Sequence, residues 1–360
     1  MIFKNSAGTE VKIFANIIDE TAQVQIKALS ECEPYKNSKI RIMPDVHAGA
    51  GCTIGTTMTI IDCVTPNLVG VDIGCGMLTT VLDARSIDFK KLDAIIYKYI
   101  PSGMSVHRTA SNYDFSELIC AHDPSINLKR AACSLGTLGG GNHFIEIDID
   151  DEHNFYLIIH SGSRNLGQNL ARFYQAKANA TNPCENKALS FLSGKDFHDY
   201  IHDIKIIQQF ASDNRKRMAE IILDKAGLQA TSQFETIHNY IDTDKMIVRK
   251  GAIRAEAGEK VLIPVNMKDG CIIAEGLGNE DWNYSAPHGA GRILSRREAR
   301  ERLSLAKFQR QMEGIYSSSV RKSTLDESPS AYKQMRDILP WIEQSVRVQK
   351  IIKAVYNFKA

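Results

Sequence analysis

The stretch from Val71 to Met77 reads Val-Asp-Ile-Gly-Cys-Gly-Met, and it constrains the chain more than any other segment. Asp72 and Cys75 lie three residues apart, and a glycine flanks Cys75 on each side. Glycine lets the backbone turn sharply and approach a ligand closely. A carboxylate and a thiolate on such a turn can point toward one metal ion, but a zinc site needs at least one or two further ligands. The sequence therefore predicts that histidines from elsewhere in the chain come to this turn.

Three histidines stand in similar settings, namely His143, His160 and His238. His143 follows three glycines at 139–141, and the alternating segment behind it predicts a β-strand. His160 ends the apolar segment 155–159, which predicts a buried strand, and the turn Ser-Gly-Ser-Arg164 follows. Such a turn before a helix favours anion binding, and the glycine run could also cradle phosphate. For a lone histidine at a strand end, a structural role is an equally good interpretation.

A fourth histidine, His288, lies in the segment Ser-Ala-Pro-His-Gly-Ala-Gly-Arg at 285–292. Proline and small residues leave room beside its imidazole, and Arg292 is available for an anion. An imidazole without metal-ligating neighbours suits nucleophilic attack on phosphorus. Asp45 and His47 lie two residues apart in 41–51, which we predict to be a loop because of its proline and glycines. Taken alone, they are better explained as a turn aspartate and an exposed histidine.

Length and composition bound the remaining possibilities. The chain has 360 residues and no linker or internal repeat, so we expect one domain over 1–360. Its net charge of +2 gives no overall argument for nucleic acid, and any such surface must be local. The eight cysteines form no short-spaced framework, and no apolar leader or membrane-length run is present. We therefore expect a cytoplasmic protein with reduced thiols and no membrane association.

The pattern of apolar residues predicts a mixture of helices and strands. We expect helices over 17–29, 88–100, 168–178 and 199–226, the last ended by Gly227, and a helix from the Ser295–Glu298 capping box to about 312. We expect strands over 55–61, 77–82, 246–249, 261–265 and 271–275, a loop over 182–195, and a helical tail over 330–358 interrupted near Pro340.

Together the turn and the histidines offer five ligands: Asp72, Cys75, His143, His160 and His238. Five exceed the need of one tetrahedral ion, so a binuclear site with a bridging Cys75 thiolate is the natural solution. From ligand type alone, zinc is the favoured metal.

The motifs that carry these residues resemble those of the RtcB family of RNA ligases. They read MPDVHAG, VGVDIGCGM, GTLGGGNHFIE, HSGSRNLG, HNY, APHGAGR and LDESPSAYK, and their order and spacing match over nearly the whole chain. The resemblance implies a single mixed α/β (α+β) domain with a central binuclear metal site. It also implies a ligase dependent on GTP and on two manganese ions (Mn2+). Such an enzyme joins RNA ends carrying a 3′-phosphate or 2′,3′-cyclic phosphate to 5′-hydroxyl ends, in RNA repair or tRNA splicing, and the need for an activating protein partner stays open.

The resemblance also implies a role for each matching residue. His288 falls on the guanylylated histidine, the five ligands above fall on the metal ligands, and Asp45 falls on an acidic residue of the later chemical steps. Arg164 and Arg292 fall on phosphate- or RNA-binding arginines. The positions that fall on GTP- or GMP-binding residues are Asn142, Phe144, Glu146, Asn266, Gly289, Ala290, Gly291, Tyr332 and Lys359.

Two positions depart from the family pattern. Ala50 stands where the family has a lysine, and Asn266 stands where it has a serine that contacts guanylate. These departures bear on nucleotide and substrate choice. Two other functions stay open from sequence: a metal-dependent phosphoesterase that opens cyclic phosphates, which would not need His288, and a non-ligating RNA end-binding protein, which would not need the metals.

Overall fold

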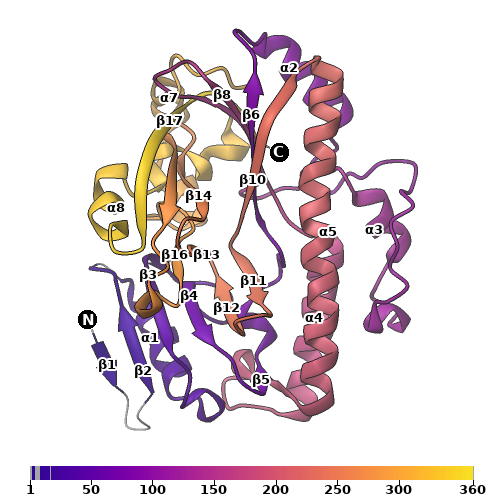
Figure 1. Ribbon diagram of the computed structural model, residues 1–360, viewed down its shortest axis with the longest axis vertical. Helices are drawn as coiled ribbons and strands as arrows, with labels where there is room; N and C mark the ends of the chain where they lie inside the picture. Colours follow the sequence, from indigo (N-terminus) through magenta and orange to yellow (C-terminus); the bar gives the residue numbers. More distant parts are fainter. Residues whose placement is uncertain (1, 5–8, 17, 360) are drawn as a thin grey trace.

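Two large β-sheets carry the fold of the computed structural model, which describes residues 2–4, 9–16 and 18–359 (Figure 1). The six-stranded sheet has the order β1 (Ile2–Lys4), β2 (Glu10–Ile13), β3 (Ile40–His47), β4 (Ile54–Thr59), β12 (Ile247–Lys250) and β11 (Asn239–Asp242). The seven-stranded sheet has the order β10 (Gln229–Ile237), β6 (Gly76–Asp83), β8 (Phe155–Ser161), β7 (Phe144–Ile149), β17 (Val346–Lys359), β15 (Gly270–Gly276) and β14 (Lys260–Asn266). Two short pairs, β13 (Ala252–Arg254) with β16 (Ser285–Pro287) and β5 (Cys63–Val64) with β9 (Leu192–Ser193), complete the strands of the described residues.

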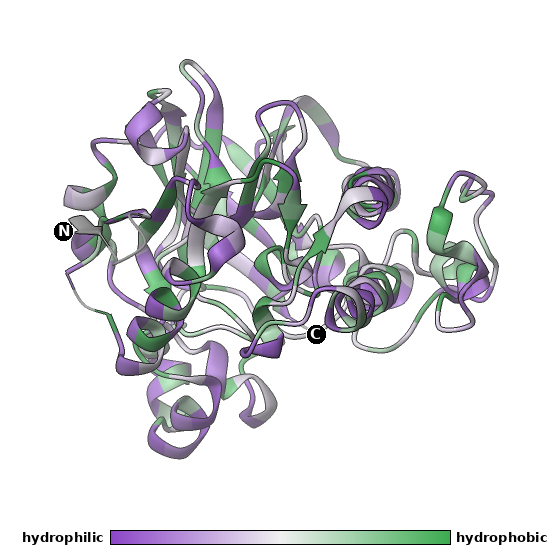
Figure 2. Ribbon diagram, turned by 90° about the horizontal axis from the view of Figure 1, so that it is seen from below, coloured by the Kyte–Doolittle hydropathy of each residue, from purple (hydrophilic) through white to green (hydrophobic). Residues whose placement is uncertain are grey.

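Eight α-helices surround these sheets in the described part of the chain. They are α1 (Glu20–Ser30), α2 (Phe89–Tyr99), α3 (Leu128–Ser134), α4 (Arg164–Thr181), α5 (Gly194–Ala226), α6 (Arg296–Arg302), α7 (Leu305–Gln311) and α8 (Met335–Ile342). In Figure 2, hydrophobic segments gather on the interior strands, while the outer helices are largely hydrophilic. None of the helices within the described ranges, the 33-residue α5 included, is long and apolar enough to cross a lipid bilayer.

Helix α5 joins the two halves of the molecule. It runs alongside β10 through most of the length of the structure (Figure 1). Ile204 and Phe210 in its first half belong to the large core that includes the six-stranded sheet, whereas Met218 and Ile222 pack with Leu78 from the seven-stranded sheet. Burying an aliphatic side chain contributes about 1.5–3 kcal/mol, so these contacts fix α5 against both sheets.

Every neighbouring pair in the seven-stranded sheet is antiparallel. In an antiparallel pair, the end of one strand lies beside the start of the next. One end of the sheet, called the shared edge below, therefore holds the last residues of β10, β8 and β17 and the first residues of β6 and β7. The register confirms this, because Gly76 pairs with Ile237 and Ser161, and Phe144 pairs with His160 and Lys359.

The predicted mixed α/β fold is confirmed, as are most of its elements. The strands predicted over 55–61, 77–82, 155–159, 246–249, 261–265 and 271–275 and the helix over 88–100 are present with shifts at their ends. The helices predicted over 168–178 and 199–226 begin earlier, at Arg164 and Gly194. The predicted loop 182–195 contains the short strand β9 and the first residues of α5. Gly227 ends α5 in the left-handed conformation, at φ 69°, and the Ser295–Glu298 capping box is formed. Residue 17 of the first predicted helix lies outside the described residues, and α1 begins at Glu20 after the N-cap Asp19.

Three predictions were wrong. The tail is not helical throughout, because its last fourteen residues form β17, whose β-branched and aromatic side chains suit a strand between β15 and β7. The predicted loop 41–51 is a strand up to His47, and Pro44 is tolerated because the pairing with β4 is irregular between Ile42 and His47. The helix predicted to reach 312 divides into α6 and α7, where Ser304 caps the second helix.

Candidate active site

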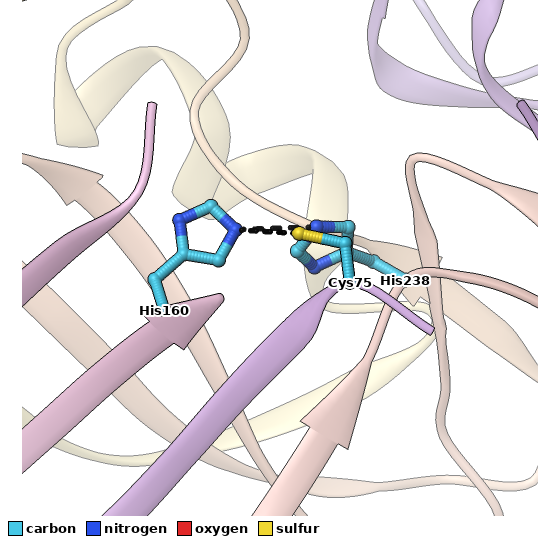
Figure 3. Close-up of side chains that lie close together, drawn as sticks. All are labelled: Cys75, His160 and His238. Atoms are coloured by element: carbon cyan, nitrogen blue, oxygen red, sulfur yellow. Dashed lines mark hydrogen bonds between the residues drawn. The ribbon is translucent and has the colours of Figure 1, made fainter. Parts of the chain in front are cut away.

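The shared edge of the seven-stranded sheet brings four predicted metal ligands together. Cys75 directly precedes β6, His143 precedes β7, His160 lies near the end of β8, and His238 follows β10. Cys75, His160 and His238 point toward one another from three adjacent strands (Figure 3). The antiparallel register, rather than proximity in sequence, therefore assembles this cluster.

The ligand atoms form two groups that share one sulfur. Asp72, Cys75 and His143 form one group, and Cys75, His160 and His238 form the other, with the ligand atoms of each group within 4.8 Å of one another. Cys75 Sγ lies 3.2 Å from His160 Nε2 and 3.5 Å from His143 Nε2. His143 Nε2 lies 2.8 Å from Asp72 Oδ2, and His160 Nε2 lies 3.4 Å from His238 Nε2. This is the arrangement expected of two metal ions bridged by one thiolate.

A tight turn aims Asp72 and Cys75 at the same point. The Cys75 backbone N–H donates to the Asp72 carbonyl at 3.2 Å, and Gly74 between them has a φ of 71°. A Cβ added at Gly74 would lie 2.8 Å from the Cβ of Ala211 on α5. Both the positive φ and the close approach require glycine here.

The burial of the ligands controls their protonation. Burial and the Asp72 charge raise the pKa of the Cys75 thiol well above its ordinary value. Burial and the neighbouring imidazoles lower the pKa of His160 and His238 well below theirs. Neutral imidazoles keep the lone pairs that bind metals, and a bound dication would displace the thiol proton. The donor set therefore fits a divalent metal.

A hydrogen bond orients His143. Its Nδ1 lies 2.8 Å from the carbonyl oxygen of Leu138, so Nδ1–H donates there and Nε2 faces Asp72 and Cys75. Metal-binding histidines are commonly oriented by such a bond on the other ring nitrogen.

Two buried polar residues of α5, Asn214 and Arg215, support the loops that carry the ligands. Arg215 donates from Nη1 to the carbonyls of Gly74 at 2.7 Å and Ser161 at 2.6 Å, and from Nε to Glu235 at 2.8 Å. Asn214 accepts from the backbone N–H groups of Gly136 and Thr137 and donates to the carbonyl of Gly162. The sequence analysis missed both residues, since nothing in a long helical pattern marks which polar side chains face inward.

His288 lies beside the ligand cluster but is held by a different residue. Its Nδ1 is 2.6 Å from Asp45 Oδ2, and its backbone N–H donates to the same oxygen. The ring centroids of His288 and His238 are 5.0 Å apart. Gly291 allows the turn to approach β3, because a Cβ there would lie 2.8 Å from the Asp45 carbonyl oxygen. Asp45 is thus buried and paired with His288, and is not a simple turn residue.

Several of the predicted nucleotide-binding residues lie next to the cluster. Phe144 packs edge-on against His160, and the Lys359 ammonium lies 5.3 Å from the Phe144 ring centroid. Glu146 is buried further along β7 and accepts from Asn357 Nδ2. Asn266 is engaged in its own turn, where its amide donates to Asp269 at 2.8 Å and its oxygen accepts from the Lys268 N–H.

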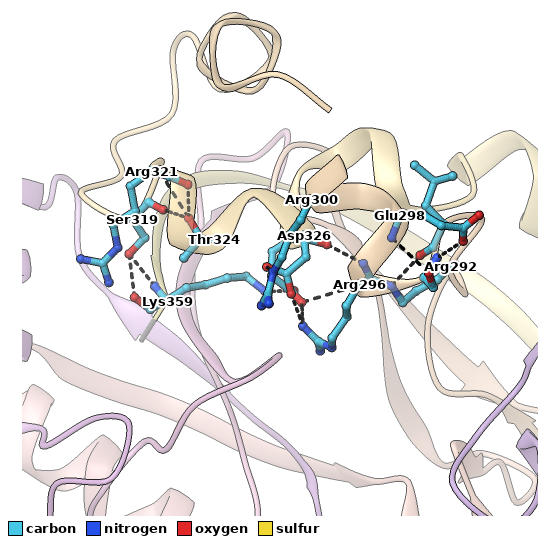
Figure 4. A network of polar contacts seen from close by, with 12 residues as sticks. Arg292, Arg296, Glu298, Arg300, Ser319, Arg321, Thr324, Asp326 and Lys359 are labelled. Atoms are coloured by element: carbon cyan, nitrogen blue, oxygen red, sulfur yellow. Dashed lines mark hydrogen bonds and ion pairs between the residues drawn. The ribbon is translucent and has the colours of Figure 1, made fainter. Parts of the chain in front are cut away.

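Three other predicted site residues converge on Glu327, which the sequence analysis did not single out. Lys359 and the Tyr332 hydroxyl both contact Glu327 Oε2, and Arg292 Nη1 lies 3.4 Å from Oε1. Arg296 contacts the same carboxylate at 2.6 Å and also pairs with Asp326 in the network of Figure 4. Burial would raise the pKa of Glu327, but Lys359 and Arg296 hold it at about 2. Its place in the LDESPSAYK motif was the available signal.

Arg292 and Arg164 both have structural partners. Arg292 donates to the carbonyls of Leu294 and Asp326 as well as to Tyr332. Arg164 begins α4 instead of lying in the predicted turn before the helix, and it donates to Thr137 Oγ1 and to the Gly103 carbonyl.

Comparisons with known proteins agree on one family. The sequence model described as tRNA-splicing ligase RtcB matches residues 25–124 and 121–360. The RNA-splicing ligase RtcB of Escherichia coli K12 is 32% identical over 377 residues, covering 91% of each chain. The tRNA-splicing ligase RtcB of Aeropyrum pernix is 27% identical over 413 residues, covering 86% of this chain and 85% of its own. The RNA-splicing ligase RtcB of Mycobacterium tuberculosis is 25% identical over 413 residues, covering 87% and 94%.

We predict that Arg215→Ala lowers the free energy of unfolding by about 3 kcal/mol, because it leaves Glu235 and two loop carbonyls without their buried partner. Urea denaturation followed by circular dichroism measures the change. Arg217→Ala is the matched control, since Arg217 lies on the same helix with 54% of its side chain exposed and, among the described residues, has its ion pair with Glu220. We expect less than about 0.5 kcal/mol there. Equal losses in the two variants would contradict the role given to Arg215.

We predict that Cys75→Ala loses both metal ions, because its sulfur belongs to both ligand groups. Metal analysis after loading with manganese and gel filtration measures the stoichiometry. Cys133→Ala is the control for removing a buried thiol elsewhere. Two ions retained by Cys75→Ala would rule out a bridging thiolate.

Proposed function

The chain is a member of the RtcB family, and from that premise we propose that it is an RNA ligase. It joins RNA 3′-phosphate or 2′,3′-cyclic phosphate ends to 5′-hydroxyl ends, in RNA repair or tRNA splicing. GTP is the activating nucleotide, and two manganese ions are the cofactors. The substrate class comes from the family, and the chemistry assigned to each residue below rests on the geometry of this chain.

The position of His288 carries the proposal. The His288 imidazole belongs to neither ligand group, and its ring centroid lies 5.0 Å from that of His238. The buried carboxylate of Asp45 contacts its Nδ1. A phosphoesterase needs only the ligand groups. A protein that merely binds RNA ends needs neither the ligand groups nor the Asp45–His288 pair. A histidine oriented by an aspartate next to a metal-binding cluster is the arrangement that nucleophilic attack requires.

The hydrogen bond to Asp45 prepares His288 for the first step. With Nδ1–H donating to Asp45, the other ring nitrogen, Nε2, keeps its lone pair. Nε2 attacks the α-phosphorus of GTP, an N–P bond forms, and the P–O bond to pyrophosphate breaks with its electron pair on the leaving oxygen. Asp45 stabilises the positive charge that develops on the imidazole, as the aspartate of a catalytic triad does.

The later steps transfer the guanylyl group to RNA. Water first hydrolyses any cyclic phosphate to a 3′-phosphate, and the P–O2′ bond breaks to leave a 2′-hydroxyl. An oxygen of the 3′-phosphate then attacks the guanylyl phosphorus, and the N–P bond to His288 breaks. The 5′-hydroxyl of the second RNA then attacks the activated 3′-phosphate, a 3′,5′-phosphodiester forms, and GMP leaves. Asp45 lies close enough to His288 to act in these steps as well.

The ligand groups would each hold one ion, the first at Asp72, Cys75 and His143 and the second at Cys75, His160 and His238. Bound there, manganese would neutralise the phosphate charge. The Asp72 carboxylate suits manganese, whereas the thiolate and the imidazoles are the reason that ligand type alone favours zinc.

We place the guanine base near Phe144 and Lys359, which pair at the shared edge beside His160, and near Glu146, two residues further along β7. Tyr332 supports Lys359 through Glu327, and Arg164 and Arg292 serve the phosphates and RNA. The remaining proposed nucleotide contacts are Asn142, Asn266, Gly289, Ala290 and Gly291.

We predict that His288→Ala keeps its fold and its metals but forms no covalent guanylate. It should still seal an RNA supplied with a pre-activated 3′-pp-5′-G end, because only the first step needs the nucleophile. Incubation with labelled GTP and manganese, followed by a denaturing gel, measures guanylylation. His198→Ala is the control, because His198 is an exposed histidine on α5, and it should label normally. Labelling of His288→Ala, or a guanylate mapped to a lysine, would show that the assignment is wrong.

We predict that the native protein labels with GTP in preference to ATP, and that Asn266→Ser strengthens the preference. Asn266 is tied to Asp269 in its turn, so it offers the nucleotide less than the serine of the family pattern does. Parallel labelling with both nucleotides measures the ratio. Equal labelling of the native protein by ATP and GTP would contradict this account of the pocket.

A further inference from the structure

A second buried cluster lies on β7, outside the groups assigned to the metals. We propose that Asp148 is protonated, shares its proton with Glu146, and thereby positions Glu146 to recognise the guanine edge of the nucleotide. Asp148 is a positioning residue in this account. The recognition part rests on the proposed function, whereas the shared proton does not.

Glu146 and Asp148 lie on the same face of β7, two residues apart. Their side chains and Cys271 Sγ on β15 form a group whose polar atoms lie within 4.8 Å of one another. Glu146 is 3% exposed, and Asp148 and Cys271 are both 0% exposed. Asp148 and Cys271 are therefore closed to water, whereas Glu146 keeps a small exposed fraction.

Apart from Glu146, the polar side chain that lies next to Asp148 among the described residues is the Cys271 thiol, a weak donor. It lies in register with Tyr156 on β8 and with Ala354 on β17, and its region of the sheet packs Ile158, Cys271 and Ile352. Neither carboxylate oxygen of Asp148 has a hydrogen-bond donor among the described residues. Glu146, by contrast, accepts from Asn357 Nδ2 on Oε2, and Cys271 Sγ lies 3.8 Å from Oε1.

Two carboxylates at this distance in an apolar interior cannot both be ionised unless a cation lies between them, so without one the pair holds a proton. Lys359 is the cation that acts on Glu146, but its ammonium is already paired with Glu327. Burial and the charge of Glu146 raise the pKa of Asp148 well above its ordinary value. Burial also raises the pKa of Glu146, while hydrogen bonds from Asp148 and Asn357 lower it, so the proton belongs on Asp148. Burial keeps the Cys271 thiol protonated as well.

A protonated Asp148 donates to Glu146 from one side, and Asn357 donates from another. The Glu146 carboxylate is then fixed in orientation and remains charged. Guanine presents N–H donors on its Watson–Crick edge, and a fixed carboxylate accepts them, whereas adenine presents an acceptor at the equivalent ring nitrogen. The pair of carboxyl groups therefore discriminates between the two purines.

The first test measures thermal stability against pH without any nucleotide. A folded-state pKa above the unfolded value of about 4 means that native stability is lost as pH rises through the gap. Asp148→Asn is neutral and can still donate to Glu146, so it escapes this loss. We expect its melting temperature to rise relative to the native protein between about pH 5 and about pH 8.

Asp150→Asn is the matched control, because Asp150 directly follows β7 but pairs with Lys350 at 2.8 Å and has a lowered pKa. Removing that carboxylate should destabilise the protein at neutral pH, with a loss that shrinks toward acid. The two variants are thus expected to show opposite dependences on pH.

The second test measures guanylylation by labelled GTP. Asp148→Leu fits the apolar surroundings but donates nothing, so its KM for GTP should rise by about tenfold while Asp148→Asn stays near native. Its melting curve shows whether it folds.

Three outcomes would overturn the inference. They are an Asp148→Asn stability difference that does not change with pH, native GTP use by folded Asp148→Leu, and one divalent ion fewer in Asp148→Asn than in the native protein. The last would mean that the pair holds a metal instead of a proton. Failure of the native protein to label with GTP would count against the proposed function, and the pH test would still decide whether the proton is shared.

Discussion

The antiparallel pairing of β10, β6, β8, β7 and β17 is the constraint on which the rest of the site depends. Because successive strands run in opposite directions, residues at the end of one strand and before the start of the next meet at one edge. Cys75, His143, His160 and His238 occupy those positions, and Lys359 ends β17 at the same edge. A slip of one residue in any pairing would turn one of these side chains to the opposite face of the sheet, so the candidate ligand cluster requires the observed register.

A site at a sheet edge needs loops held in place, and α5 does this with buried polar groups. Arg215 and Asn214 are both 0% exposed, and their partners are backbone groups of the loops beside Cys75, His143 and His160. Burying a guanidinium is costly unless its hydrogen bonds are satisfied. Apolar packing along α5 fixes the helix against both sheets, and this holds Arg215 and Asn214 in position for their hydrogen bonds. Here the polar contacts specify geometry, while the apolar ones supply the stability.

The sequence predicted well which residues converge in the candidate ligand cluster and predicted their supports poorly, for a physical reason. Cys75, His143 and His288 each stand beside glycines or proline, which mark unusual backbone in the chain itself. Arg215 and Glu327 have partners far along the chain, such as Gly74 and Lys359, and such pairing leaves no local pattern. The prediction of a helical tail was wrong for the same reason, because the tail forms a strand only through its pairing with β7 and β15. Asp45 lay between these cases, since its residue type was conspicuous but its partner His288 was 243 positions away.

The proposed nucleophile and the proposed metal ligands come from different parts of the fold. Asp45 lies on β3 of the six-stranded sheet, and His288 follows the short strand β16. The residues of the ligand groups lie at or next to the ends of strands of the seven-stranded sheet. The His288 turn is also tied to β14 through the hydrogen bond from Ala290 N–H to the Pro264 carbonyl. The position of His288 relative to the ligand cluster is therefore set by how the two sheets pack, not by any single loop. Under the proposed function, a substrate bound between the sheets would contact groups from both at once, so its binding would favour the packing that brings the imidazole to the ligand cluster.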